Sequence, residues 1–116
     1  MKHEYRQLKI WQLAREINKK VYSISENFPA TEKFGLISQI RRASISIASN
    51  ISEGSSYESP KMFGNYLQIA LGSLCEVETQ FYLAVDINYL KRNILEEIIE
   101  MTDMLKRMII SFKKTL

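Results

Sequence analysis

The sequence predicts an all-α fold, an up-down-up-down antiparallel four-helix bundle that forms a single domain over residues 1–116. With only four Gly and two Pro in the chain, few turns are available, and long elements are favoured over many short ones. Apolar residues recur at spacings of three and four, the period of a helix with one buried face. The hydrophobic content of 46% against 25% charged residues is sufficient for one core.

The first two helices are expected over residues 7–27 and 32–54. Apolar positions repeat from Ile10 onward, and Pro29 follows the first helix and stops it. Thr31 is expected to cap the second helix, with the acidic Glu32 in its first turn. Gly54 is expected to end that helix in the left-handed conformation. The segment SISIAS alternates like a strand, but no turn separates it from QIRRA, so it is assigned to the helix.

The third and fourth helices are expected over residues 60–87 and 93–115. A Ser59 cap followed by Pro60 in the first helical position is a typical helix start, since proline lacks the N–H that would need a partner there. Asn88 tolerates a positive φ and is expected to end the third helix, and Asn93 is expected to cap the fourth. Short connections place consecutive helices antiparallel, which gives the up-down-up-down order.

Several apolar side chains fall outside the buried stripes, mainly on the third and fourth helices. Scattered surface hydrophobes would account for them, but their recurrence on one helix favours an interface between subunits. The chain is therefore expected to associate with itself. The expected interface residues are Ile45, Tyr66, Ile69, Tyr82, Met101 and Met108.

The positive charge lies in the first half of the chain. Residues 1–58 contain nine Lys/Arg and six Asp/Glu, whereas residues 59–116 contain seven of each, and the net charge is +3. Cations interleaved with aromatic side chains can bind nucleic acid through phosphate attraction and base stacking, although Lys and Arg on a helix are often only solvated. The candidate RNA- or DNA-binding residues on the first two helices are Arg6, Lys9, Lys19, Lys20, Arg41 and Arg42.

The two adjacent arginines have two interpretations. Arg41 or Arg42 could pair with Glu76 or Glu78, within the subunit or across an interface, as an ion pair that fixes the register of the helices. Alternatively, their planar guanidinium groups could contact phosphates.

The sequence favours a protein that is not an enzyme and that has no metal or cofactor. The one His, His3, lies at an end expected to fray, and no glycine pattern supports a nucleophile or a phosphate-binding loop. The acidic residues of the fourth helix are expected to form a solvated face, with Asp103 opposite Arg107. Cys75 alone allows no internal disulfide. No secretory signal or membrane-spanning stretch is recognised, so a cytoplasmic location is expected.

Three segments carry a family resemblance: IWQLA, NFPATEKFGLISQIRRASISIASNISEG and YLQIALGSLCEVETQFYLA. They resemble the bacterial four-helix bundle family historically called the 23S rRNA intervening-sequence protein, and more distantly the accessory variability protein of diversity-generating retroelements. The likeness spans nearly the whole chain. The residues that match the family motif, or that would form its ion pair, include Gln39, Arg41, Arg42, Asn50, Glu53, Gly54, Glu76 and Glu78.

The resemblance implies a homopentameric ring without enzymatic activity, with a proposed role in nucleic-acid binding. The leading hypothesis is thus a non-enzymatic homo-oligomer that binds RNA or DNA through basic surfaces of its first two helices. The alternative is an assembly scaffold or adaptor for another protein, in which the arginines are structural.

Overall fold

The computed structural model describes residues 3–116, and that part of the chain contains four α-helices and no strand. The predicted all-α class is confirmed. The helices are α1 (Lys9–Ser25), α2 (Leu36–Ser55), α3 (Pro60–Asp86) and α4 (Arg92–Lys113). Two short 3-10 turns, Tyr5–Gln7 and Ala30–Glu32, precede α1 and α2.

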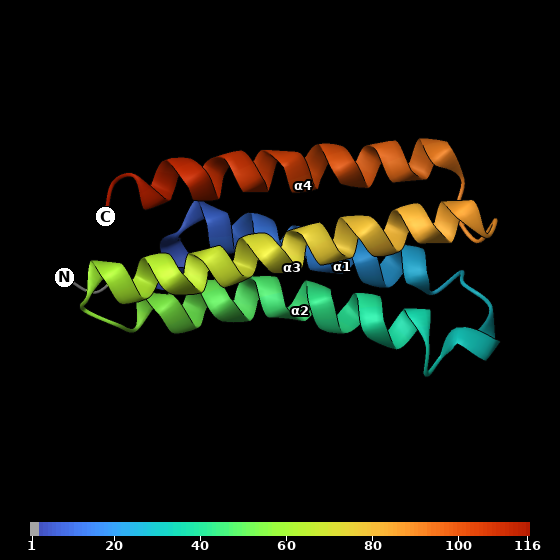
Figure 1. Cartoon of the computed structure of the whole chain (residues 1–116), viewed down its shortest axis with the longest axis horizontal. Coiled ribbons are helices and arrows are strands. Elements are labelled where there is room, and N and C mark those ends of the chain that lie inside the picture. Colours follow the sequence, from blue (N-terminus) through green and yellow to red (C-terminus); the bar gives the residue numbers. More distant parts are fainter. Residues whose placement is uncertain (1–2) are drawn as a thin grey trace.

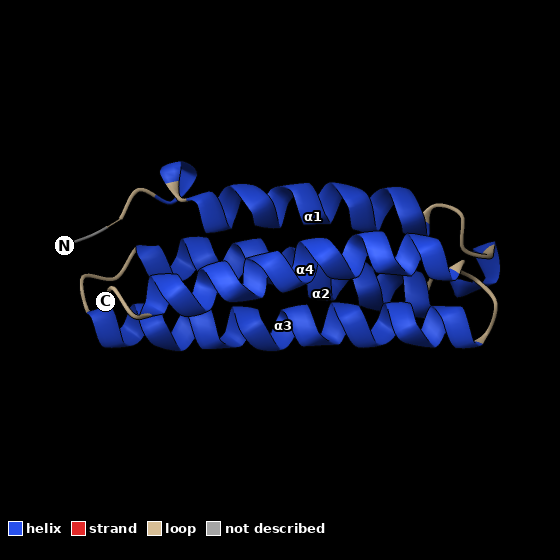
Figure 2. Cartoon of the chain, turned by 90° about the horizontal axis from the view of Figure 1, so that it is seen from above, coloured by secondary structure: helices blue, strands red, loops and turns tan. Residues whose placement is uncertain are grey.

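The four helices lie side by side along the 46 Å long axis of the molecule (Figures 1 and 2). The connections α1–α2 and α3–α4 are at one end, and the α2–α3 connection is at the other, together with the beginning of the described chain and the C-terminus. Among the described residues, α1 contacts α2, α2 contacts α3, α3 contacts α4 and α4 contacts α1. Each helix thus packs against two neighbours around one core.

The residues repeated at spacings of three and four form four stripes, or seams, one on each predicted helix, and these seams form that core. They run from Ile10 to Phe28, Ile37 to Ile51, Leu67 to Ala84 and Leu95 to Phe112. Every seam residue predicted for the first and third helices is buried, and in the other two helices only Ile37 and Phe112 are half-buried. The largest fully buried side chains come from all four helices, for example Ile17, Ile47 and Phe81. Removing such side chains from water contributes about 1.5 to 3 kcal/mol each, which makes the core the main stabilising element.

The start of α2 differs from the prediction. Thr31 does not cap the helix, because it lies inside the 3-10 turn, and α2 begins only at Leu36. The capping oxygen comes instead from the side chain of Glu32, whose Oε1 accepts the Leu36 N–H at 3.0 Å. The segment SISIAS is helical throughout, as predicted.

The role predicted for Gly54 is wrong. No glycine in the described part of the chain has a positive φ, and Gly54 lies within α2, which ends at Ser55. A Cβ on Gly54 would lie 2.6 Å from the Tyr66 Cβ and 2.9 Å from Phe63 Cδ1. This glycine is therefore required by the close approach of α2 and α3, not by a turn.

The other helix ends agree only in part with the sequence. Ser59 caps α3, since its Oγ accepts the Met62 N–H at 3.2 Å, and Asn88 follows α3 with a φ of 65°. Both predictions are confirmed. Asn93 is not a cap, because α4 begins one residue earlier and its N-cap position is Lys91. The first helix begins at Lys9 rather than at residue 7, because the 3-10 turn occupies that position.

Of the helices in the described part, none combines the length and the apolar character needed to cross a membrane.

Candidate nucleic-acid interface

The outer face of α1 and α2 contains two adjoining hollows, which together define the α1/α2 face. The hollow near the α1–α2 connection has a volume of about 530 Å³ and the other about 320 Å³. Ile45 lines both, with 47% of its surface exposed. Lys33, Arg41 and Arg42 line the larger hollow, and Arg15 and Lys19 line the smaller one. The face is therefore basic with an apolar floor.

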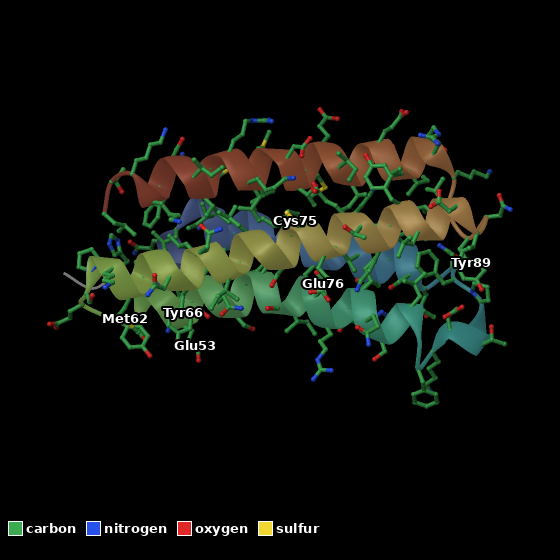
Figure 3. All side chains as sticks on the ribbon, viewed as in Figure 1. Glu53, Met62, Tyr66, Cys75, Glu76 and Tyr89 are labelled. Atoms are coloured by element: carbon green, nitrogen blue, oxygen red, sulfur yellow. The ribbon has the colours of Figure 1, made fainter. Side chains whose placement is uncertain are left out.

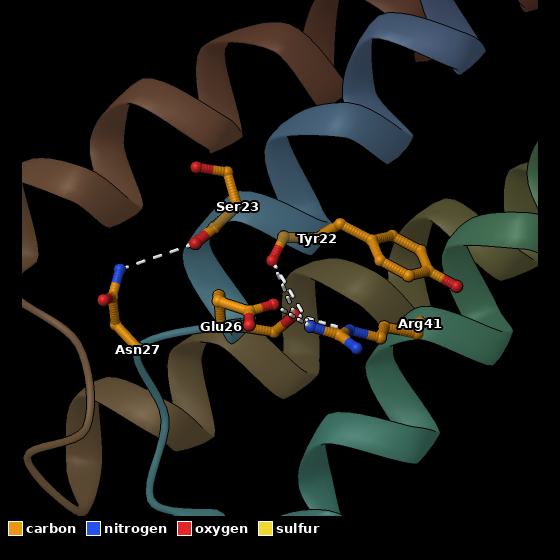
Figure 4. A network of polar contacts seen from close by, with 6 residues as sticks. Tyr22, Ser23, Glu26, Asn27 and Arg41 are labelled. Atoms are coloured by element: carbon orange, nitrogen blue, oxygen red, sulfur yellow. Dashed lines mark hydrogen bonds and ion pairs between the residues drawn. The ribbon is translucent and has the colours of Figure 1, made fainter.

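Arg41 is held by the end of α1 (Figure 4). Its Nε donates to Ser25 Oγ at 2.9 Å, and its Nη2 donates to Glu26 Oε2 at 3.2 Å and to the Tyr22 carbonyl at 3.4 Å. The guanidinium carbon also lies 4.4 Å from the centre of the Tyr22 ring. With these contacts, Arg41 clamps α2 to α1 and its charge is balanced by Glu26.

Arg42 differs from its neighbour. It is exposed, and its side chain makes no hydrogen bond or ion pair within the described residues. Lys33 also forms no ion pair within the described residues. The larger hollow therefore has two cations whose charges are not balanced by a carboxylate of residues 3–116. Such groups are well placed to attract phosphates.

The predicted ion pair with Glu76 or Glu78 is not formed within the described part of the chain. Glu76 lies exposed at the middle of α3 (Figure 3), where the Gln80 side chain donates to it at 3.5 Å. Glu78 pairs with Lys106 of α4 at 2.7 Å. The prediction failed because Glu26 and Lys106 are nearer partners for the two groups, and sequence spacing alone does not reveal them.

One hydrogen bond joins α1 and α2 beside the smaller hollow, and the two cations of that hollow contact side chains of α1 itself. Ser44 Oγ donates to Asn18 Oδ1 at 2.9 Å across the helix pair. The Arg15 guanidinium lies 4.9 Å from the centre of the Trp11 ring, which leaves its edges free to donate. Lys19 is 3.9 Å from Glu16, a pair of exposed groups that solvent screens strongly.

The remaining predicted cations lie elsewhere. Lys20 points to α4, where its Nζ is 3.5 Å from Glu97. Arg6 lies 3.5 Å from Glu4 in the N-terminal turn. Lys9 lines a third hollow, between the start of α1 and the end of α4, with Arg107 and Met108. Of the six predicted residues, only Lys19, Arg41 and Arg42 are brought together.

Sequence reasoning missed three residues of the α1/α2 face: Arg15, Lys33 and Phe34. Phe34 is 89% exposed, and Lys33 Nζ lies 5.6 Å from the centre of its ring. The signal that could have found them is the pair Lys33-Phe34 directly before the glycine that precedes α2, since an aromatic residue in such a turn has no helical seam to join.

Several motif residues have a structural role between α2 and α3. The hydroxyls of Ser46 and Ser73 are 2.9 Å apart, and Asn50 Nδ2 donates to the Ser46 carbonyl at 2.7 Å. Together with Gly54, these small polar residues permit close contact between the two helices. Gln39 and Glu53 are exposed.

Tyr66 adds a further polar contact at the α2–α3 end of the molecule. Its hydroxyl lies 3.3 Å from that of Tyr57, and the two rings stack. The hydrogen bond to Tyr57 raises the pKa of Tyr66, with burial and the nearby charge of Glu53 acting in the same direction.

A second polar network joins α3 to α4. The Thr102 hydroxyl donates to Glu78 Oε2 at 2.5 Å, and Lys106 Nζ donates to Oε1 of the same carboxylate. This hydrogen bond to Glu78 raises the pKa of Lys106, and Asp103, 3.4 Å away, adds to the effect. Asp103 therefore pairs with Lys106 and not, as predicted, with Arg107, because Lys106 is already drawn to this site by Glu78.

The expected interface residues differ in exposure. Ile45, Ile69 and Tyr82 are about half exposed, whereas Tyr66, Met101 and Met108 are half-buried within the subunit. The outer face of α3 also exposes Met62 and Leu83. It includes Gly72, at which a Cβ would meet no other described atom within 4 Å. This face has few apolar partners within the subunit.

The side chain of His3 packs on the end of the bundle. Its ring packs edge-on against Phe63 and Phe112, with centroids 5.3 and 5.5 Å away, so the expectation of a frayed end is wrong at this residue. Among residues 3–116, no three His, Cys, Asp or Glu side chains are grouped so that they could hold a metal ion.

Comparisons with known proteins show a family and a similar fold. The model of the family described as 23S rRNA-intervening sequence protein matches residues 6–111. A crystal structure from Bacteroides thetaiotaomicron VPI-5482, described as a protein with unknown function from the S23 ribosomal protein family, is similar, with a TM-score of 0.80 and 27% sequence identity. The similarity covers 90% of this chain and 98% of that one. No curated protein matches.

Proposed function

The chain belongs to the 23S rRNA-intervening sequence protein family, and on this premise we propose that it is a non-enzymatic, cytoplasmic protein that binds RNA or DNA through its α1/α2 face. The proposed unit is an up-down-up-down four-helix bundle that assembles into a homopentameric ring. The observation that carries the proposal is the pair of basic hollows, where Lys33 and Arg42 have no carboxylate partner within residues 3–116.

The chemistry of this face fits a phosphate backbone. Arginine presents a planar donor group to phosphate oxygens, and lysine adds a compact charge, so both attract a polyanion and release its counterions. One subunit has a net charge of only +3, which is modest for a nucleic-acid-binding protein. A ring of identical subunits would repeat the face around one axis and thereby raise the local positive potential.

Exposed apolar side chains support the proposed assembly. Ile69, Tyr82 and Leu83 of α3 are each about half exposed, and Ile45 lies between the two basic hollows. Contacts between copies would remove part of this apolar surface from water. In this proposal each subunit has one basic face, and the ring brings several copies of that face together.

Binding measured as a function of salt tests the proposal. The wild-type chain should bind labelled RNA or DNA with an affinity that falls steeply as salt is raised. Arg42→Ala should weaken binding and reduce the slope of log K against log salt by about 1. Arg92→Ala, which removes an exposed arginine at the start of α4, is the matched control. It should leave the affinity and the salt slope unchanged. Weak, salt-insensitive retention of both nucleic acids would contradict the proposal.

A scaffold for another protein is the second candidate, and the clamp formed by Arg41 favours it. Arg41 uses its donors on Ser25, Tyr22 and Glu26, so at least one arginine of the pair is structural. The exposed apolar face of α3 would then contact the partner. A pull-down dominated by one protein and unaffected by nuclease treatment would support this function over nucleic-acid binding.

A further inference from the structure

Phe34 has a position that the core does not explain. With 89% of its surface exposed, it is the most exposed large apolar side chain of the described chain, and the next are Ile69 and Ile87 at 51%. Exposed single hydrophobes are common. This ring differs from them because it is almost fully exposed and lines a basic hollow.

The turn that carries Phe34 is fixed on both sides. Glu32 Oε1 accepts the Leu36 N–H at 3.0 Å, and Glu32 Oε2 accepts the Tyr89 hydroxyl, also at 3.0 Å. Tyr89 lies at the α3–α4 connection (Figure 3), so this carboxylate ties the turn to the neighbouring connection at the same end of the molecule. A Cβ on Gly35 would lie 2.6 Å from Glu32 Oε1, and a larger residue there would displace the carboxylate.

The surroundings of the ring are cationic. Lys33 Nζ lies 5.6 Å from its centre, and Phe34 lines the larger hollow together with Arg41 and Arg42. The apolar side chain of Ile37 lines the same hollow. The solvent-exposed ring therefore lies near Lys33 and shares its hollow with Arg42, and neither cation has an ion-pair partner in the described chain.

We propose that Phe34 stacks on an unpaired nucleobase, so that the α1/α2 face takes single-stranded RNA or DNA in preference to a duplex. Stacking on a protein ring requires a base whose face is accessible, and the bases of a duplex are covered by their neighbours. Lys33 and Arg42 contact the phosphates on either side of the stacked base. This inference rests on the proposed function and adds to it the class of nucleic acid and the residue that selects it.

A second copy of the chain is the other occupant that an exposed phenylalanine could anchor. Three features favour a nucleic acid over that copy. The unbalanced charge of the hollow is positive, and the cations line the same hollow as the Phe34 ring. The turn that carries Phe34 is also fixed by hydrogen bonds. A self-association site would more readily pair the cations with carboxylates. The two occupants give different results in the experiment below.

The test uses the full chain and labelled strands of about 12 nucleotides, a length within the range of site sizes of single-strand-binding proteins. Single-stranded RNA, single-stranded DNA and the corresponding duplexes are compared, with inorganic polyphosphate as a probe that carries charge but no bases. The variants are Phe34→Ala and Phe34→Trp. Ile110→Ala, which truncates a half-exposed apolar side chain on α4, is the matched control. Mass in solution is measured for every variant.

Phe34→Ala should weaken single-strand binding by about 5- to 150-fold, the range found when one stacking aromatic residue is removed. It should leave polyphosphate binding, the salt slope and the mass unchanged, because no charge is lost. Phe34→Trp should retain the binding, with its added indole fluorescence quenched by the single strand. The RNA and DNA arms show which sugar the face accepts.

Three results would overturn the inference: equal affinity for single strands and duplexes, full single-strand binding by Phe34→Ala, or a Phe34→Ala chain that loses its assembly. The first two leave the proposed function intact if binding remains dependent on salt. The absence of salt-dependent binding to any of these nucleic acids would instead remove the proposed function, and the inference with it.

Discussion

The two adjacent arginines show how different roles arise from neighbouring positions on one helix. One helical step rotates a side chain by about 100°, so Arg41 reaches the end of α1 while Arg42 faces outward. Arg41 is 25% exposed at its side chain and has three partners, whereas Arg42 has none in the described chain. The pair thus combines a structural clamp with a cation that is available to a ligand.

Arg41→Ala is expected to lower the free energy of unfolding by about 1 to 3 kcal/mol, because charge-assisted hydrogen bonds and the packing on Tyr22 are lost. Arg42→Ala is expected to change stability by no more than about 0.5 kcal/mol, as for most surface substitutions. Urea denaturation of both variants measures the difference. Equal losses of stability in the two variants would contradict the separation of roles.

At the scale of the helices, the sequence predicts periodic features well and tertiary ones poorly. The seams from Ile10 and from Leu67 are buried as expected, because a spacing of three and four constrains which face is covered. The Ser59 cap and the positive φ of Asn88 are local and were also predictable. The prediction for Gly54 is wrong because the sequence does not distinguish a glycine required by close helix contact from a glycine required by a turn.

The α1/α2 face could be predicted only in part, because some of its residues carry a local sequence signal and others depend on contacts distant in the sequence. Arg41 and Arg42 stand out in the sequence as adjacent charges in an apolar helix, but the partners of Arg41 depend on how α1 ends. Lys33 and Phe34 carry no periodic signal, and their place beside Arg42 follows from the Glu32 cap and its bond to Tyr89. Contacts across 57 positions of sequence leave no local pattern.

Two glycine substitutions test the account of helix packing. Gly54→Ala should destabilise the fold by about 1 to 3 kcal/mol, because the new methyl group would displace Tyr66 and Phe63. Gly72→Ala should stabilise the isolated subunit by about 0.5 to 1 kcal/mol, since its Cβ would meet no described atom within 4 Å and alanine favours a helix. Thermal unfolding of both variants measures the effects, and a tolerant Gly54→Ala chain would contradict the close contact of α2 and α3.

The cap of α2 gives a pH dependence of stability. The Leu36 N–H, and after it the Tyr89 hydroxyl, lower the pKa of Glu32. The contribution of the carboxylate is therefore fully present above the ordinary pKa of 4.5 and is lost as the pH falls from there through the lower folded value. Glu32→Gln should be less stable near neutral pH and should lose less on acidification.

Urea midpoints of the wild type and Glu32→Gln at about pH 7 and about pH 3 measure this dependence. The pKa of Tyr89 is raised by the same hydrogen bond, so Tyr89 stays protonated at both of these pH values and does not itself titrate between them. Parallel losses of stability in the two chains on acidification would show that Glu32 is not the titrating cap.

At the scale of the whole molecule, one face is proposed to mediate assembly and another to bind nucleic acid. A subunit of 13.5 kDa exposes apolar side chains on α3 and a basic face on α1 and α2. Ile69→Asp is expected to reduce the mass in solution, since a charge on the α3 face opposes its burial between copies. Asp at this exposed position should leave the helical content of the subunit unchanged, which circular dichroism checks. An Ile69→Asp chain of undiminished mass would place the interface elsewhere.

The most direct test of the central claim is sedimentation of the chain together with a labelled single strand. The account predicts that at low salt the label travels with a species of five chains, and that raising the salt releases the label while the protein keeps its mass. A protein that sediments as a 13.5 kDa species, with the label travelling separately at every salt concentration, would contradict it.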